Sequence, residues 1–190
     1  MLLAGGRSVR MGRDKALLHC AGQPLWLIQA SKLHALQPVR LFIACRREQG
    51  LHETVPVDLK AEWLFDPPDT DCGPMGPVIM ALERVQSPLL VLAVDMPHMT
   101  ARFLEEAVGH TQEQGLFFTV AGGIEPLAGI YTPAMLPLLR TAFDSCQYSL
   151  RMALLHAQKQ NLVMIRPLSD TGATLFTNAN TPEDWRQAGA

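Results

Sequence analysis

The sequence lacks a surplus of charge of either sign. Lysine and arginine number 16 against 18 aspartate and glutamate residues, which gives a formal net charge of −2 at pH 7. Proteins that coat nucleic acid carry a strong positive field, so we expect no nucleic-acid partner for this chain. A local cationic pocket stays compatible with the composition. Any anionic ligand would therefore be bound by a few well-placed basic residues.

Long apolar segments are also missing. The run Leu89–Val94 falls far short of the roughly 20 residues that a membrane-spanning helix needs. The N-terminus shows no basic stretch followed by an apolar core and a cleavage site, which is the pattern of a secretory signal. We therefore expect a cytoplasmic protein with no membrane partner, in which Leu89–Val94 is a buried strand.

Several catalytic and metal-binding motifs do not occur. The four cysteines show no C-x-x-C pair and no histidine at metal-ligand spacing, which argues against a zinc site or a disulfide framework. There is no G-x-S-x-G elbow and no H-E-x-x-H helix, and the six histidines are scattered. The cysteines, interpreted as buried or incidental thiols, are Cys20, Cys45, Cys72 and Cys146.

What the sequence does contain is an alternation of apolar runs and helical patterns, typical of an α/β layer fold. With 190 residues, 48% of them hydrophobic and 18% charged, the chain fits one globular domain over residues 1–190. Continuous apolar runs predict strands buried on both faces. A glycine turn at 121–126 predicts a hairpin or another antiparallel addition, so the sheet should be mixed and mostly parallel. Strands are expected at 1–3, 40–45, 89–94, before Asp66, and near 116–121, 127–131, 161–165 and 173–177; helices are expected at 24–36, after Pro77, and near 100–114, 133–143 and 148–158.

The most informative segment is the glycine-rich stretch from Ala4 to Lys15. Its small residues let backbone N–H groups approach an anion closely, and Arg10 and Lys15 would supply positive charge. The lysine does not follow a glycine directly, as it does in a Walker A loop, and the glycine spacing is not that of a dinucleotide fingerprint. Taken alone, the stretch is equally compatible with a triphosphate cradle and a surface turn.

Two aspartates stand directly after apolar strands, where open α/β sheets bind ligands. Asp95 follows the run 89–94, and a lone carboxylate there suits Mg²⁺, although a helix N-cap is an equal alternative. Asp66 precedes the turn Gly73–Gly76, which either admits a ligand or simply reverses the chain. Near the end of the sequence, Thr181–Pro182 predicts the start of a C-terminal helix.

Four motifs in this order resemble the molybdenum cofactor guanylyltransferase family: Leu3–Gly6 with Arg10–Lys15, Gly73–Pro74, Asp95–Pro97 and Asn178–Asp184. The resemblance spans nearly the whole chain. It implies a three-layer α/β/α, Rossmann-like nucleotidyltransferase fold. It also implies Mg²⁺-dependent transfer of GMP from GTP to molybdopterin, which forms the guanine dinucleotide cofactor and pyrophosphate. The implied partners are GTP, molybdopterin and molybdoenzyme-maturation proteins.

The same resemblance assigns roles to individual residues. The attacking phosphate of molybdopterin is already ionised, so no strong general base is needed. The family places more apolar residues before the glycine-rich loop than Met1–Leu3, and we therefore expect the natural chain to start slightly earlier. The implied roles are catalysis by Arg10, Lys15 and Asp95; GTP binding by Leu3, Ala4, Gly5, Gly6, Lys15, Asp66 and Asp95; metal binding by Asp95; and contacts with the second substrate by Arg151, Asn178 and Asn180.

Two alternatives stay open. A cytidylyltransferase that makes the cytosine dinucleotide, or another small-molecule nucleotidyltransferase, would use a similar loop, and the resemblance of Gly5–Gly6 and Asp14–Lys15 favours GTP. A non-catalytic nucleotide-binding module for molybdoenzyme maturation is the second alternative, and the intact Lys15 and Asp95 argue against it.

Overall fold

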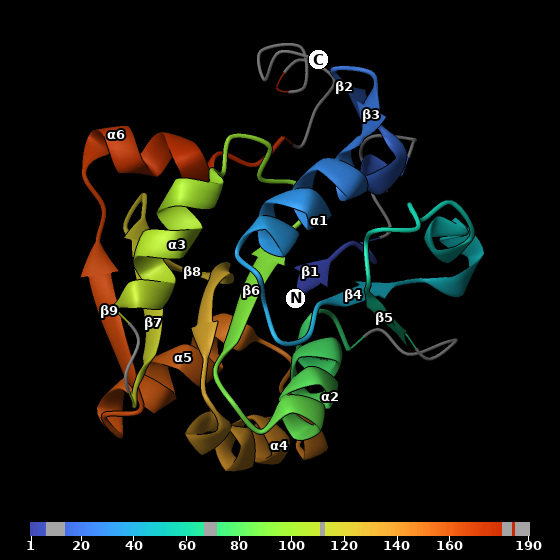
Figure 1. The fold of residues 1–190 in the computed structure, drawn as a ribbon. Coiled ribbons are helices and arrows are strands. Elements are labelled where there is room, and N and C mark those ends of the chain that lie inside the picture. Colours follow the sequence, from blue (N-terminus) through green and yellow to red (C-terminus); the bar gives the residue numbers. More distant parts are fainter. Residues whose placement is uncertain (7–13, 67–71, 111–112, 180–183, 185–190) are drawn as a thin grey trace.

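A seven-stranded mixed sheet forms the centre of the protein (Figure 1). The structure is a computed structural model and describes residues 1–6, 14–66, 72–110, 113–179 and 184. Strand β8 runs antiparallel to β6 and β7, whereas the other neighbouring pairs in the sheet are parallel, which confirms the predicted mixed, mostly parallel sheet. In spatial order the strands are β5 (Glu62–Phe65), β4 (Phe42–Cys45), β1 (Leu2–Leu3), β6 (Leu89–Ala93), β8 (Gly123–Tyr131), β7 (Gly115–Val120) and β9 (Val163–Pro167).

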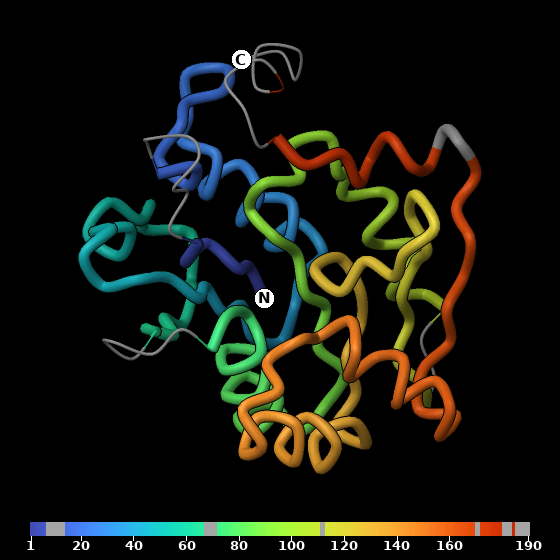
Figure 2. Tube along the Cα trace, turned by 180° about the vertical axis from the view of Figure 1, so that it is seen from behind, coloured from blue at the N-terminus to red at the C-terminus, as the bar shows by residue number. Residues whose placement is uncertain are grey.

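Helices cover both faces of the sheet and give the predicted three layers, as Figures 1 and 2 show from opposite sides. Helices α1 (Leu25–Ala35) and α3 (Ala101–Gly109) pack on one face, and α2 (Met75–Val85), α4 (Leu136–Asp144) and α5 (Leu150–Lys159) pack on the other.

Strand β4 shows why the parallel strands need unbroken apolar sequences. Phe42 and Ala44 belong to the apolar cluster that includes α2, whereas Ile43 and Cys45 belong to the cluster that includes α1. All four side chains are buried. Because both faces of the strand are covered by helices, an alternation of polar and apolar residues would leave polar groups in the core.

The first two long helices lie close to where the sequence predicts them. Helix α1 has Pro24 at its N-cap position and Leu36 at its C-cap. Helix α2 begins at Met75, so the predicted start after Pro77 is too late. A proline fits inside the first turn because the first N–H groups of a helix have no intrahelical partner.

The hairpin expected in the second half of the chain is confirmed, with a longer second strand than predicted. Strand β8 begins at Gly123 and pairs there with Val120 at the end of β7. Only Ala121 and Gly122 remain for the turn, with φ angles of 48° and 77°. Two central residues with positive φ are typical of the tight turns whose twist matches that of a hairpin.

The strand expected at 173–177 is wrong. Asp170–Ala173 forms a short helix (α6), and Thr174–Phe176 forms a 3₁₀ turn (η6). The hydroxyl of Ser169 caps this helix, and the ring of Phe176 packs at 5.4 Å from the ring of Phe103. Phe176 also lies 5.5 Å from the ring of Phe118 on β7, so it packs against α3 and the face of the sheet without pairing as a strand. The helix predicted from Thr181 lies outside the described residues, apart from residue 184.

Two further features of the structure concern its helices and its cysteines. In the part of the chain that the structure describes, no helix combines the length and the apolar character needed to cross a membrane. Cys45 and Cys72 are buried and Cys146 is exposed. Burial raises the pKa of the Cys45 thiol to about 12, so this group stays protonated at neutral pH and is unsuited to act as a nucleophile.

Candidate active site

Strands β5, β4, β1 and β6 are parallel neighbours, so their carboxyl ends meet at one edge of the sheet (Figure 1). Backbone pairing continues past the strand ends. The N–H groups of Ala4, Asp66 and Val94 donate to carbonyl oxygens of the neighbouring strand over 2.8, 3.1 and 3.0 Å, respectively. The glycine-rich loop, Asp66 and Asp95 therefore leave the sheet at the same edge, where open α/β sheets bind ligands.

The side chains of Lys15 and Asp95 meet at this edge. Lys15 opens a 3₁₀ turn (η2, Lys15–Leu17), which Asp14 caps by accepting the N–H of Ala16 over 3.0 Å. The Nζ atom of Lys15 lies 3.1 Å from Oδ2 of Asp95, and the side chains are only 14% and 23% exposed. Partly buried pairs are screened less by salt than surface pairs. The ion pair links the end of the glycine-rich loop to the end of β6.

Helix α1 holds the segment that carries Asp95. The amide Nε2 of buried Gln29 donates to the carbonyl oxygen of Met96 over 2.6 Å. One turn further along the helix, Nζ of Lys32 donates to the carbonyl oxygen of Pro97 over 3.0 Å, and burial lowers the pKa of this lysine. The backbone beyond β6 is thus fixed from the side of α1.

Asp95 does not cap a helix. The N-cap of α3 is Thr100, whose hydroxyl accepts the N–H of Phe103 over 3.2 Å. The N-cap alternative for Asp95 is therefore wrong, because the capping role belongs to another residue, and its metal role stays a prediction. Its carboxylate instead faces Lys15.

The surroundings of Asp95 fit a magnesium ion whose coordination shell is completed by substrate oxygens and water. Within the described ranges, no group of three or more His, Cys, Asp and Glu side chains could hold a metal by itself. Mg²⁺ commonly takes one or two carboxylates from the protein and fills its octahedron with phosphate oxygens and water. The N–H of Ala179 donates to the carbonyl oxygen of Asp95 over 2.9 Å, and the side-chain oxygen of the adjacent Asn178 is buried without a hydrogen-bond partner. The C-terminal segment is thereby tied to the backbone of Asp95, next to Asn178.

Asp66 lies against the glycine-rich loop. A Cβ atom added at Gly5 would come within 2.4 Å of Oδ2 of Asp66, so only glycine allows the carboxylate to approach the backbone so closely. Burial raises the pKa of Asp66, an effect that the positive charge of Arg46 opposes. A partly buried carboxylate is stabilised in its charged form by a ligand that donates hydrogen bonds to it.

Arg151 and Glu125 lie on the β8 side of Asp95. Arg151, on the first turn of α5, donates from Nε to the carbonyl oxygen of Ile124 over 3.2 Å. The antiparallel ladder of β6 and β8 sets Leu92 opposite Ala128. Three residues after Leu92, just past the end of β6, stands Asp95, and three residues before Ala128 stands Glu125.

Burial is the main cause that raises the pKa of Glu125. The N–H of Leu127, which donates to Oε1 over 2.9 Å, opposes that shift. The charge of Asp95 adds to it and that of Arg151 opposes it. The charges that act on Glu125 thus come from the predicted metal ligand, Asp95, and from a predicted contact of the second substrate, Arg151.

Of the other predicted site residues, the structure describes Leu3 and Gly6 but not Arg10 and Asn180. Leu3 is half-buried at the end of β1, and Gly6 is exposed, with no atom within 4 Å of an added Cβ. Arg10 and Asn180 lie outside the described residues. Sequence reasoning also missed Arg46 and Gln49, two polar residues after β4 whose side chains reach the glycine-rich loop.

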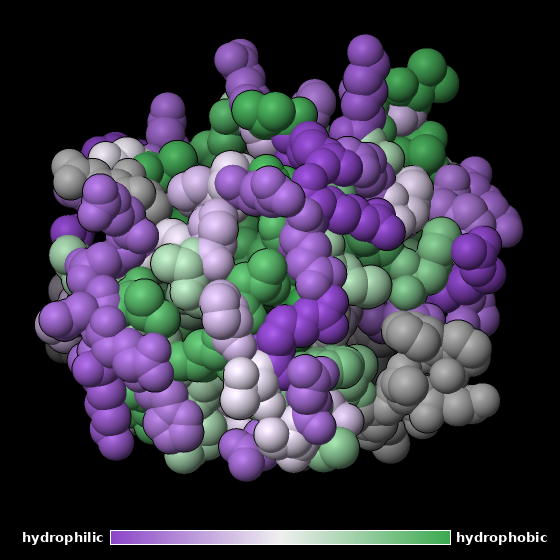
Figure 3. Space-filling model, turned by 90° about the horizontal axis from the view of Figure 1, so that it is seen from below, coloured by the Kyte–Doolittle hydropathy of each residue, from purple (hydrophilic) through white to green (hydrophobic). Residues whose placement is uncertain are grey.

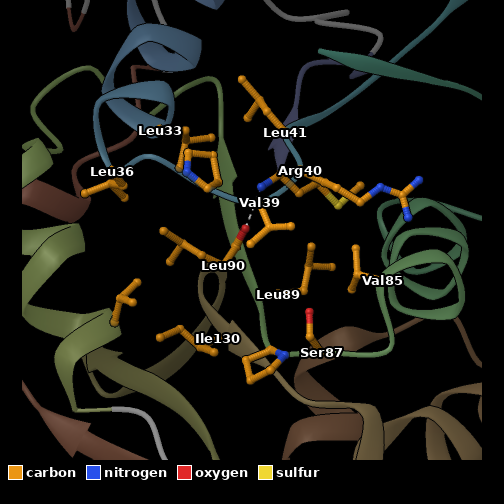
Figure 4. Close-up of a pocket in the computed structure, with 14 residues that line it drawn as sticks. Leu33, Leu36, Val39, Arg40, Leu41, Val85, Ser87, Leu89, Leu90 and Ile130 are labelled. Carbon is orange, nitrogen blue, oxygen red and sulfur yellow. Dashed lines mark hydrogen bonds between the residues drawn. The ribbon is translucent and has the colours of Figure 1, made fainter. Parts of the chain in front are cut away.

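A pocket of about 260 Å³ lies at the opposite edge of the sheet, where the parallel strands begin (Figure 4). Its lining is mostly apolar, and Figure 3, a view from below, shows apolar side chains among polar ones on that side of the molecule. The charged residue in the lining, Arg40, pairs with Glu62 over 2.6 Å. The amino group of Met1 donates to the carbonyl oxygen of Leu90 over 2.7 Å. The pocket therefore does not coincide with the Lys15–Asp95 pair.

The sequence and the fold are similar to those of known nucleotidyltransferases. A family model described as a MobA-like NTP transferase domain matches residues 1–162. The chain is 31% identical over 204 residues to a "Probable molybdenum cofactor guanylyltransferase" of Synechococcus elongatus, covering 98% of this chain and 95% of the relative.

Among solved structures, molybdopterin-guanine dinucleotide biosynthesis protein A from Archaeoglobus fulgidus is similar with a TM-score of 0.74 and 22% identity, over 99% of this chain and 95% of the other. The CTP:phosphocholine cytidylyltransferase of Streptococcus pneumoniae is similar with a TM-score of 0.67 and 13% identity, over 98% and 95% of the two chains. At these identities the structural likeness shows the fold alone.

Proposed function

The chain belongs to the MobA-like NTP transferase family, and from this premise we propose that it transfers GMP from GTP to molybdopterin. The products are the guanine dinucleotide cofactor and pyrophosphate, and the reaction uses Mg²⁺. The observation that carries the proposal is the shielded pair of Lys15 and Asp95, which stands at the carboxyl edge of the sheet beside the glycine-rich loop. A cation for phosphates and a carboxylate for a metal are the two groups that nucleotidyl transfer needs.

Repulsion between two phosphorylated substrates is the main obstacle to this reaction. At 4 Å and an effective dielectric constant near 20, each pair of unit charges is worth about 4 kcal/mol. In the proposal, Arg10 and Lys15 bind the β- and γ-phosphates, and the backbone N–H groups of Gly5 and Gly6 face them. Asp95 holds the magnesium ion, which when bound supplies Lewis-acid and charge stabilisation at the phosphates. The attacking phosphate is already ionised, so these residues orient it in line and remove no proton.

The two substrates lie on opposite sides of Asp95 in this proposal. Leu3 and Asp66 contact the nucleoside on the β1 and β5 side, where Asp66 lies against Gly5. Arg151, Asn178 and Asn180 contact molybdopterin on the β8 side. The position of Arg151 beside β8 and the unpartnered oxygen of Asn178 support this division.

Two other functions are distinguishable by experiment. A cytidylyltransferase uses the same fold, so the fold does not choose the base. A non-catalytic nucleotide-binding module would bind GTP without turning it over. The shielded Lys15–Asp95 pair favours a catalyst, because nucleotide binding alone does not require a carboxylate near the phosphates.

The decisive test is pyrophosphate release by the purified protein. We expect release only when GTP, Mg²⁺ and molybdopterin are all present, and we expect Lys15→Ala to abolish it. The exposed Lys60 supplies the matched control, and Lys60→Ala should keep wild-type turnover. GTP binding without pyrophosphate release by the wild-type protein would favour the non-catalytic module instead.

A further inference from the structure

We propose that Arg46 and Gln49 form a loop clamp that holds both ends of the glycine-rich loop and thereby positions it for the nucleotide. Arg46 is the N-cap of a 3₁₀ turn (η3, Arg47–Gln49) that follows β4, and Gln49 is the last residue of that turn. The inference rests on the proposed function, in which this loop binds GTP. It assigns positioning roles to two residues that lie outside the resemblance motifs.

Gln49 joins the two ends of the loop through one amide group. Its Nε2 donates to the carbonyl oxygen of Ala4 over 2.9 Å and to Oδ2 of Asp14 over 2.8 Å. Its Oε1 accepts the N–H of Arg46 over 2.7 Å. Both amide hydrogens and the oxygen are thus engaged, and the residue is only 9% exposed. A buried glutamine with every polar group satisfied is held in one orientation.

Arg46 bridges the same two ends a second time. Its Nε donates to the carbonyl oxygen of Gly5 over 3.1 Å, and a terminal nitrogen donates to Oδ2 of Asp14 over 2.6 Å. One oxygen of Asp14 therefore accepts from both clamp residues, while its other oxygen caps η2 through the N–H of Ala16. Charge-assisted hydrogen bonds of this kind are stronger than neutral ones.

The clamp bears on the reaction through Lys15. Asp14 immediately precedes Lys15, whose Nζ lies 3.1 Å from Oδ2 of Asp95. Fixing Asp14 therefore fixes the base of the side chain that meets the metal-binding carboxylate. Because Ala4, Gly5 and Asp14 are already held, they lose less conformational entropy when the nucleotide binds, so the clamp should raise the affinity for nucleotide.

The neighbouring arginine provides a matched control. Arg47 belongs to the same 3₁₀ turn, but its guanidinium stacks over the ring of Phe65 at 4.0 Å. Arg46→Gln and Arg47→Gln thus remove the same charge from adjacent positions. Arg46→Lys keeps the charge of Arg46 but loses its planar fork. Gln49→Met removes both donors of Gln49 at nearly constant volume.

The experiment measures the dissociation constant of GTP with Mg²⁺ at a temperature well below the melting temperature of each variant. We expect Arg46→Gln, Arg46→Lys and Gln49→Met to weaken GTP binding about tenfold or more, and Arg47→Gln to change it less than twofold. If Arg46→Gln fails to fold, Arg46→Lys and Gln49→Met decide. If the wild type binds GTP and the Arg46, Gln49 and Arg47 variants bind it with equal affinity, the clamp is overturned but the proposed function is not. A wild-type protein that binds no nucleotide would overturn the clamp and the proposed function together.

Discussion

Asp95 is the residue on which the proposed chemistry depends most. Replacing it by asparagine keeps the shape of the side chain and removes the charge that would hold Mg²⁺ beside the phosphates. We expect Asp95→Asn to lower turnover by at least about a hundredfold, because metal stabilisation of phosphoryl charge is worth several kcal/mol. Turnover measured against Mg²⁺ concentration tests this. The exposed Asp58 gives the control, and Asp58→Asn should behave as wild type. Wild-type turnover in Asp95→Asn would refute the metal assignment.

Gly5 is the residue whose missing side chain matters most. An alanine there would place its Cβ 2.4 Å from Oδ2 of Asp66, whereas at Gly6 nothing lies within 4 Å. We expect Gly5→Ala to lower the free energy of unfolding by about 1–3 kcal/mol, as overpacked sites do. Gly6→Ala should change it by less than about 0.5 kcal/mol. Urea denaturation without nucleotide measures both values, and equal stabilities of the two variants would contradict the close approach of Asp66.

Helix α1 acts as the element that holds the Asp95 segment. The donor of Gln29 reaches the carbonyl oxygen of Met96 at 2.6 Å in a fully buried position. Gln29→Met would leave this buried oxygen without its donor, and we expect the free energy of unfolding to fall by about 1–3 kcal/mol. Ser31→Ala, at an exposed position of the same helix, should be nearly neutral. Thermal unfolding of the two variants side by side checks the prediction, which fails if both are neutral.

Elements were predictable where one local pattern decides them. Strands β4 and β6 need unbroken apolar runs because both faces are covered, and such runs are visible in the sequence. The segment around Leu175 and Phe176 is apolar as well and by itself predicts a strand, but it forms a helix and a 3₁₀ turn. Its conformation depends on the cap at Ser169 and on the distant ring of Phe103. Contacts between segments far apart in the sequence leave no local periodicity.

Only part of the candidate site could be predicted from the sequence, again because long-range contacts leave no local pattern. Asp95, Asp66 and Lys15 stand at strand ends or in a glycine-rich loop, which are positions with a general link to ligand binding. Gln49 stands in an ordinary polar stretch, and its partners Ala4 and Asp14 lie 45 and 35 positions away. Only the order of the strands in the sheet brings β4 next to β1 and reveals this contact. That residues 1–190 form one domain stays a prediction.

At the scale of the whole molecule, a buried amino group should make stability depend on pH. Burial lowers the pKa of the Met1 amino group from 8.0 to about 5. Between these values the unfolded chain binds the proton and the folded chain does not, so stability falls as the pH falls through this window. In a protein that begins at Met1, this amino group should lower the free energy of unfolding by about 2 kcal/mol from pH 7.5 to 5.5, because the slope stays somewhat below about 1.4 kcal/mol per pH unit near each pKa.

An N-acetylated chain isolates this effect, because it has no titrating amino group while Asp66, Glu125 and the other titratable side chains remain. Urea denaturation of both proteins at several pH values gives the difference. We expect the difference in unfolding free energy between the two proteins to change with pH in the window between about 5 and 8.0. Parallel curves over that window would show that the amino group is not buried.

The molecule as a whole is a near-neutral protein for a strongly anionic reaction. Its charge of −2 leaves no general positive field, so the phosphates depend on Lys15, Arg10 and a metal ion on Asp95. The most direct test of this account compares ATP, GTP, CTP and UTP as donors of a nucleoside monophosphate to molybdopterin, with Mg²⁺ present. The account predicts that pyrophosphate and a dinucleotide cofactor form selectively with GTP. A preference for CTP would contradict it.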